Sequence, residues 1–283
     1  MFNNLISIDP QNLSEEDYHS DTARISASMI KTCWMKTPAH VYASYFDPAR
    51  LTDKKSSFTF GSMFHAAILE KSEFDNRFVI IPDGIDRRTK DGKALWADIE
   101  ASGKSAIKQA EWEVCQKMAA KLLAHPFLIE HDPVRGSKEF PILGDGVRCK
   151  PDLLFVYGKR AVCVDLKSCA DASPRGFERA SFNFAYHIQA AWYADMVEAL
   201  YGVPCEFYFA CSEKSAPHLP VVYKASDEMI ASGRVAYKEN LEIIQECLKT
   251  GVWPGHGEEV QTLDLPQWAY EQETDESIIF GEE

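Results

Sequence analysis

The chain has 283 residues, of which 46% are hydrophobic and 26% are charged, a content too apolar for a disordered protein. This length allows one large α/β domain that buries a core without disulfide bonds. The formal net charge of −13 argues against a nucleic-acid coat protein or a polybasic membrane binder. It does not exclude an enzyme with a local basic channel, because salt screens charges that lie more than about 8 Å from a phosphate under physiological conditions.

Residues 1–130 are predicted to be mainly helical. Apolar residues at helical spacing predict three helices, over 27–35, 60–70 and 105–124. Ser26 is suited to cap the first of them, and Pro38 interrupts the pattern that follows. Between the second and third helices we expect a short strand over 78–81 and an exposed polar loop over 83–93.

The region 131–270 changes to strand-like patterns. Five strands are predicted, over 139–143, 147–157, 161–167, 205–211 and 219–223. Helices are expected over 186–201 and about 227–249, and the acidic segment 271–283 is expected to be a frayed tail. The pattern predicts an α/β fold with a mixed sheet and with helices before it, after it and crossing over it.

The chain carries no sign of a membrane or secreted location. It has no run of 18 apolar residues, and its first ten residues lack the basic and long apolar parts of a signal peptide. None of its eight cysteines forms a C-x-x-C pair, which argues against a zinc ribbon or a redox motif. We therefore expect a cytoplasmic protein with reduced cysteines that does not bind a membrane.

Two aspartates on successive predicted strands are the most informative residues. Asp152 lies early on one strand and Asp165 at the end of the next, so a hairpin can bring their carboxylates together. Adjacent carboxylates repel each other unless a hard divalent cation such as Mg²⁺ bridges them. Lys167 shares a face with Asp165 and can orient a water or stabilise a phosphate. Glu139 can add a carboxylate. The alternative interpretation of Asp-x-Lys alone is an exposed ion pair.

Two helices can add polar groups to this site. Gln189 and Tyr193 are four residues apart and share a helix face, from which they can bind phosphate or orient water. The alternative places Tyr193 in the core and Gln189 in solvent. His65 is structural unless its helix packs over the sheet edge, where one imidazole nitrogen can bind a metal.

These residues resemble, in their order, the PD-(D/E)XK nuclease superfamily in its variant with an upstream histidine. The order is Gly61-Ser-x-x-His65, Glu139, Pro151-Asp152, Asp165-x-Lys167 and Gln189-x-x-x-Tyr193. The chain is more closely similar to the RecE-type exonuclease VIII family, over 15–19, 25–28, 37–39, 74–78, 148–152, 165–171, 186–189, 253–254 and 265–269. The resemblance implies one nuclease domain over 1–283, with a PD-(D/E)XK-like mixed central sheet flanked by helices.

The same resemblance implies a Mg²⁺-dependent exonuclease that degrades the 5′-ended strand of linear duplex DNA and leaves 3′ tails for recombination. Mn²⁺ is expected to substitute for Mg²⁺. The expected partners are linear duplex DNA, a single-strand annealing or recombinase protein, and further copies of the chain in a ring trimer or tetramer. By resemblance, the metal ligands are His65, Glu139, Asp152, Asp165 and the carbonyl of Leu166. Lys167 is the catalytic lysine, with Asp152, Asp165, Gln189 and Tyr193 completing the catalytic set.

Other basic residues are candidate DNA contacts or solvated surface charges, namely Arg87, Arg88, Arg148 and Lys150. Two further functions stay open. One is a helicase- or CRISPR-associated nuclease of the same superfamily, many of which hold an iron–sulfur cluster through cysteine groups that this sequence lacks. The other is a catalytically silent DNA-end-binding protein, against which the intact Asp152, Asp165 and Lys167 argue.

Overall fold

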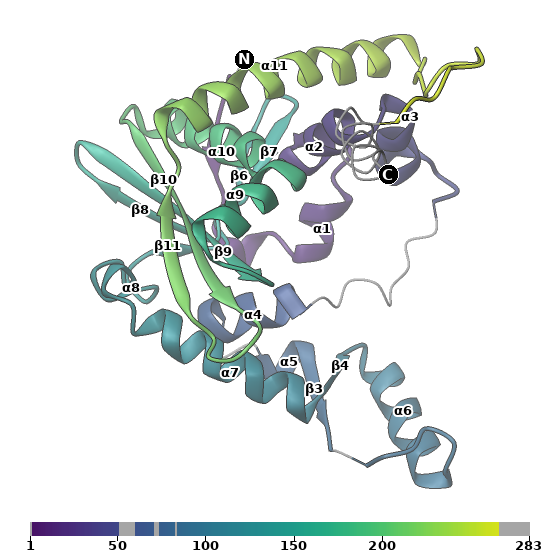
Figure 1. Cartoon of the computed structure of the whole chain (residues 1–283), viewed down its shortest axis with the longest axis vertical. Helices are drawn as coiled ribbons and strands as arrows, with labels where there is room; N and C mark the ends of the chain where they lie inside the picture. The colour runs from purple at the N-terminus through teal and green to yellow at the C-terminus, as the bar shows by residue number, and fades with distance from the viewer. Residues whose placement is uncertain (1, 51–59, 71–73, 83, 266–283) are drawn as a thin grey trace, which may run out of the picture.

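The computed structural model describes residues 2–50, 60–70, 74–82 and 84–265. The predicted acidic tail and residues 266–269 of the last family segment lie outside these ranges. At the centre is a five-stranded mixed sheet in the order β11–β10–β9–β8–β5 (Figure 1). Its strands are β5 (Ser137–Lys138), β8 (Leu153–Tyr157), β9 (Arg160–Cys169), β10 (Cys205–Glu213) and β11 (Pro220–Lys224). The predicted mixed α/β fold is confirmed.

The sheet is mixed because one crossover interrupts its antiparallel pairs. β9 and β10 are parallel, and the chain passes between them through α9 (Pro174–Asn183) and α10 (Tyr186–Tyr201). The pairs β8–β9, β10–β11 and β5–β8 are antiparallel. The β8–β9 hairpin therefore matches the short turn predicted from the sequence, and the parallel pair matches the crossing helix.

Alternation along β9 sends its side chains into two different cores. Ala161 and Cys163 pack in the core beneath α2 (Ala27–Met35), α10 and α11 (Asp227–Thr250), whereas Val162 and Val164 pack against α4 (Phe60–Leu69) and α7 (Gln109–Leu123). Figure 1 shows these two helical layers on opposite faces of the sheet. The same alternation places Asp165 and Lys167 on the α10 face.

The remaining elements surround this sheet. A four-stranded sheet has the order β1 (Ile6–Ser7), β6 (Ile142–Gly144), β7 (Val147–Cys149), β2 (Ile25–Ser26), and β3 (Phe78–Ile81) pairs with β4 (Ser105–Lys108). The other helices are η1 (Pro10–Asn12), α1 (Glu15–Ser20), α3 (Pro38–Val41), η2 (Tyr42–Phe46), α5 (Phe74–Arg77), α6 (Lys90–Ser102) and α8 (Pro126–Glu130). In Figure 1, β3, β4 and α6 project away from the central sheet.

Three predicted elements are wrong in their bounds. The segment predicted as the start of a helix at 105 is β4, because Ile107 is buried in a parallel pair with β3. The loop predicted over 83–93 ends early, because Thr89 caps α6 and its side chain accepts a hydrogen bond from the Gly92 amide. The single strand predicted over 147–157 is two strands in different sheets.

The described residues also contain elements that the sequence patterns missed, among them α1, α6 and α9. Ser26 precedes α2 as predicted, although its side chain makes no capping hydrogen bond. Within the described ranges, no helix has both the length and the apolar character needed to cross a membrane.

Candidate active site

Asp152 and Asp165 lie beside each other at the end of the β8–β9 hairpin. Leu153 pairs with Val164, so extending this register by one residue places Asp152 opposite Asp165. The strands stay in contact there, because the Leu166 amide donates a 2.7 Å hydrogen bond to Asp152 Oδ2. Both carboxylates are buried. The predicted convergence of the two aspartates is therefore present in the structure.

A cluster of possible metal ligands forms around Asp152. One ligand atom from each of His65, Glu139 and Asp152 lies within 4.8 Å of the others. His65 Nδ1 is 3.5 Å from Asp152 Oδ2 and 3.8 Å from Glu139 Oε1. An imidazole nitrogen and two carboxylates are a donor set that fits a divalent cation.

The orientation of His65 is fixed by the backbone of β9. Its Nε2 lies 2.8 Å from the carbonyl oxygen of Leu166, and since a carbonyl only accepts, Nε2 carries the hydrogen. This leaves Nδ1 facing the two carboxylates, as when a metal-binding histidine donates its other N–H to a backbone carbonyl. In this structure the Leu166 carbonyl contacts the His65 ring, so its predicted role as a metal ligand stays a prediction.

Without a cation, protons must balance the charge of this cluster. Burial raises the pKa of Asp152 to about 7, and the charges of Asp165 and Glu139 add to this effect while His65 opposes it. Burial disfavours the protonated form of His65, but the charge of Asp152 and the contact with Glu139 outweigh it and raise the pKa to about 9. Carboxylates that resist ionisation when crowded together are stabilised by a bound cation.

Glu139 reaches the cluster through an uncommon backbone conformation. It lies between β5 and β6 with φ of 44°, a left-handed conformation that costs a non-glycine residue about 1 kcal/mol. Its amide donates to the Asp152 carbonyl, which holds the two residues together. Lys150 Nζ is 2.9 Å from Glu139 Oε2 and also contacts Glu15. Although burial raises the pKa of Glu139, His65 and Lys150 bring it below its usual value.

Lys167 belongs to a second polar group on the α10 side. Its Nζ lies 2.5 Å from Asp165 Oδ2 and donates to Gln189 Oε1 at 3.3 Å. Gln189 Nε2 in turn donates to Asp165 Oδ1 at 2.6 Å. Burial lowers the pKa of Lys167, but the charge of Asp165 outweighs this and raises it to about 12. Lys167 is therefore a fixed cation at neutral pH.

A cavity of about 410 Å³ opens beside the ligand cluster. Its lining includes His65, Glu139, Asp152, Tyr193, Arg148 and Lys150. Burial raises the pKa of Tyr193 well above its usual value, so the phenol stays neutral. Arg148 is only 3% exposed, and its Nε and Nη1 have no hydrogen-bond partner among the described residues. Its guanidinium carbon lies 4.7 Å from the centre of the Tyr18 ring.

Arg87 and Arg88, which were candidate DNA contacts, do not line this cavity. Arg87 stacks over Trp96, and Arg88 forms a paired hydrogen bond with Asp86. Both precede α6, in the part of the molecule that projects from the sheet (Figure 1). The structure therefore brings Arg148 and Lys150, but not Arg87 and Arg88, to the candidate site.

Sequence reasoning missed three residues near the site. Tyr186 lies beneath Lys167 Nζ, which is 4.6 Å from its ring centre, and Lys31 Nζ is 5.3 Å from the same ring. The spacing of Tyr186 three residues before Gln189 on one helix face was the available signal. Lys31 and Tyr18 come from α2 and α1, and no motif marks them, because only tertiary packing brings those helices to the sheet.

Comparisons with known proteins agree with this fold. Residues 26–266 match the model of a family described as a PDDEXK-like domain of unknown function (DUF3799). Among solved structures, the chain is similar to an Eubacterium rectale protein described as a "putative exonuclease", with a TM-score of 0.58 and 14% identity over 92% of this chain and 97% of that one. At this identity the likeness shows the fold alone. No match was found among curated proteins.

Proposed function

Because the chain belongs to the DUF3799 family of PDDEXK-like domains, we propose that it is a divalent-metal-dependent DNA nuclease. Its substrate is linear duplex DNA, of which it digests the 5′-ended strand and leaves a 3′ single-stranded tail. The observation that carries the proposal is the meeting of His65, Glu139 and Asp152 beside the Asp165–Lys167 pair. The resemblance to the RecE-type exonuclease family supports the direction of digestion.

Hydrolysis of a phosphodiester forms a bond from a water oxygen to phosphorus and breaks the bond to the 3′ oxygen of the leaving group. His65, Glu139 and Asp152 would hold a divalent cation such as Mg²⁺, which would supply charge neutralisation for the phosphate and Lewis acidity toward the attacking water. Lys167, a fixed cation, orients the attacking water and stabilises negative charge on the phosphate. Gln189 positions both Lys167 and Asp165 through its amide.

The cavity beside the ligands suits a phosphate of the bound strand. Arg148 lines this cavity, its buried Nε and Nη1 have no hydrogen-bond partner among the described residues, and a guanidinium with free donors recognises phosphate oxygens. Lys150 is already neutralised in part by Glu139 and Glu15, so we assign Arg148 the larger share of the attraction.

The deciding experiment follows the digestion of end-labelled linear duplex with and without Mg²⁺, comparing 5′-phosphate with 5′-hydroxyl ends and with a covalently closed circle. We expect metal-dependent loss of the 5′-ended strand, survival of the 3′ tail, and no cutting of the circle. Cutting of the circle would contradict an exonuclease, and DNA binding without cleavage at any Mg²⁺ or Mn²⁺ concentration would identify a silent end-binding protein.

Metal binding is tested separately from cleavage by following the thermal unfolding of the protein in Mn²⁺. A ligand held 100-fold above its Kd stabilises the folded state by about 2.7 kcal/mol. We expect this stabilisation for the wild-type protein and its loss in Asp152→Asn. Equal stabilisation of both proteins by Mn²⁺ would contradict the ligand assignment.

A further inference from the structure

Two phenylalanines of the crossover between β9 and β10 are exposed, which is uncommon for large apolar side chains. Phe182 is 67% exposed and Phe184 is 56% exposed. Phe182 lies in the last turn of α9 and Phe184 directly after it, in the crossover that also supplies Gln189. With the half-buried Trp34 of α2, whose ring centre is 5.6 Å from that of Phe182, they form what we call the aromatic ridge.

A short series of ring contacts joins this ridge to the candidate site. The ring of Phe184 stacks on that of Tyr186 with centres 5.7 Å apart. The next contact is from the Tyr186 ring to Lys167 Nζ, at 4.6 Å. One ring therefore separates the exposed Phe184 from the cation assigned to the reacting phosphate, and a base attached near that phosphate comes within reach of Phe184.

The backbone keeps Phe184 outside while Tyr186 packs inside. Ala185, between them, has φ of 51°, a left-handed conformation that is unfavourable for a residue with a Cβ. Ala185 itself is fully buried. If the helix continued regularly through Ala185, the Phe184 and Tyr186 rings would point in other directions relative to each other. The left-handed conformation of Ala185 therefore determines which of the two rings is exposed.

The charges around the ridge favour a nucleic acid over an apolar protein segment. Arg175 and Arg179 are exposed on α9, and Phe182 follows on the same helix face at a spacing of three to four residues. Lys31 lies on the other side, against Tyr186. Exposed rings between cations are the combination that binds single strands, because each base offers a π-face and each nucleotide a phosphate.

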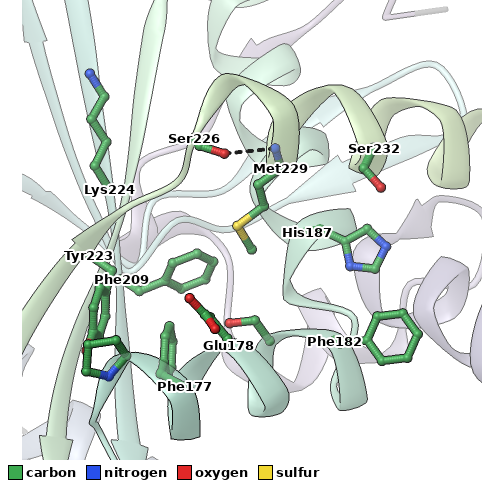
Figure 2. Close-up of a pocket in the computed structure, with 12 residues that line it drawn as sticks. Phe177, Glu178, Phe182, His187, Phe209, Tyr223, Lys224, Ser226, Met229 and Ser232 are labelled. Carbon is green, nitrogen blue, oxygen red and sulfur yellow. Dashed lines mark hydrogen bonds between the residues drawn. The ribbon is translucent and has the colours of Figure 1, made fainter.

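A pocket next to the ridge extends the aromatic surface. Figure 2 shows Phe182 at one side of it, beside His187, and Phe177 and Tyr223 at the other. The pocket has a volume of about 410 Å³, and a carboxylate, that of Glu178, lies on its lining. A carboxylate repels a phosphate but accepts hydrogen bonds from base amino groups, so this side of the ridge suits bases and not backbone.

We propose that the aromatic ridge of Trp34, Phe182 and Phe184 stacks unpaired bases of the DNA strand next to the cleaved phosphate, and so holds the end of the duplex open. This inference rests on the proposed nuclease function and adds to it the recognition of unpaired bases.

The test uses duplexes that carry the fluorescent base 2-aminopurine at each of the first positions from the 5′ end, since stacking on neighbouring bases quenches its emission in the duplex and unpairing restores it. Binding is measured with an inactive protein, Lys167→Met with Asp165→Asn, so that the DNA stays whole. In this background we expect the emission to rise on binding at one or two positions. Phe184→Ala should abolish that rise and weaken binding about tenfold, and Phe184→Trp should restore the affinity.

Phe182→Ala should have a similar but smaller effect, and Ile129→Ala, which removes a 65% exposed apolar side chain on α8, should have none. The inference would be overturned if Phe184→Ala and Phe182→Ala left both the emission rise and the affinity unchanged. It would also be overturned if their sole effect were a change in oligomeric state, which would identify a protein contact. Cleavage by the wild-type enzyme is assayed in parallel. If the wild-type enzyme cuts DNA but the ridge variants behave like wild type, the ridge inference fails and the nuclease proposal stands. If the wild-type protein neither cuts nor binds DNA, both proposals fail.

Discussion

Asp165 connects the two polar groups of the candidate site. It accepts a hydrogen bond from Gln189 and contacts Lys167, and it lies across the strand pair from Asp152. Its side chain is 3% exposed, so its negative charge depends on the Lys167 ammonium for compensation. Breaking such a buried pair costs far more than replacing both partners, because one charge is left alone.

This arrangement allows the proposed catalytic role of Lys167 to be separated from its structural role. We expect Lys167→Met to lower cleavage at least about 100-fold and to reduce the free energy of unfolding by about 3 kcal/mol, because Asp165 loses its partner. Adding Asp165→Asn should restore most of the stability and none of the activity. The measurements are DNA cleavage and chemical denaturation. Recovery of cleavage in the double variant would show that Lys167 acts only by neutralising Asp165.

The proposed phosphate contact of Arg148 has a cost in stability. Its buried guanidinium lacks partners for two nitrogens, and burial lowers its pKa. We expect Arg148→Met to leave the free energy of unfolding unchanged or to raise it by about 1 kcal/mol, while DNA binding weakens about tenfold. The control is Arg160→Met, which removes an exposed partner of Glu206 and should change neither quantity. Severe unfolding of Arg148→Met would mean that the arginine is structural.

The convergence of Asp152, Asp165 and Lys167 could be predicted because alternation within one hairpin is a local property. Gln189 could be predicted from its place at the start of the next helix. The composition of the surrounding sequence could not show that Arg148, but not Arg87 or Arg88, lies at the candidate site, since all three lie in polar or mixed segments. What separates them is burial against Tyr18, a contact between α1 and β7 that links distant parts of the chain.

At the scale of elements, strongly periodic segments were predicted well. Residues 186–201 form α10 with the predicted bounds, and α11 ends one residue beyond the prediction. The errors occur where tertiary pairing outweighs the local pattern. Ile107 fits a helical series but pairs with Ile80 in a strand, and the run over 147–157 divides where Pro151 lets the chain leave one sheet for another.

The close approach of α10 and α11 gives a prediction for Gly233. A Cβ on this residue would lie 2.1 Å from the carbonyl oxygen of His187, in the first turns of the helix that carries Gln189. Alanine is otherwise the better helix former, yet we expect Gly233→Ala to cost about 1–3 kcal/mol because the backbones must separate. Denaturation measures this. The exposed neighbour variant Ser232→Ala should be neutral, and a stabilised Gly233→Ala would show that the helices are not so closely packed.

The whole molecule has a net charge of −13 and a proposed polyanionic substrate. Long-range repulsion is screened beyond about 8 Å at physiological salt, so the cations near the strand decide whether it binds. Arg148, Lys31 and Lys167 lie at the site, and Arg175 and Arg179 lie on the adjoining helix. An acidic surface elsewhere disfavours DNA bound away from the site.

Two variants of equal net charge distinguish local from global electrostatics. Arg175→Ala with Arg179→Ala and Lys159→Ala with Arg160→Ala each remove two positive charges and take the net charge from −13 to −15. In the second pair, Lys159 lies in the β8–β9 turn and Arg160 is the first residue of β9, at the opposite end of that strand from Lys167. Each phosphate contact contributes about 0.7–0.9 to the slope of log affinity against log salt. We expect the first variant to bind DNA more weakly, with a slope shallower by about one to two, and the second to bind like wild type. Equal weakening in both would mean that the charge of the whole molecule governs binding, because only the position of the lost charges differs between them.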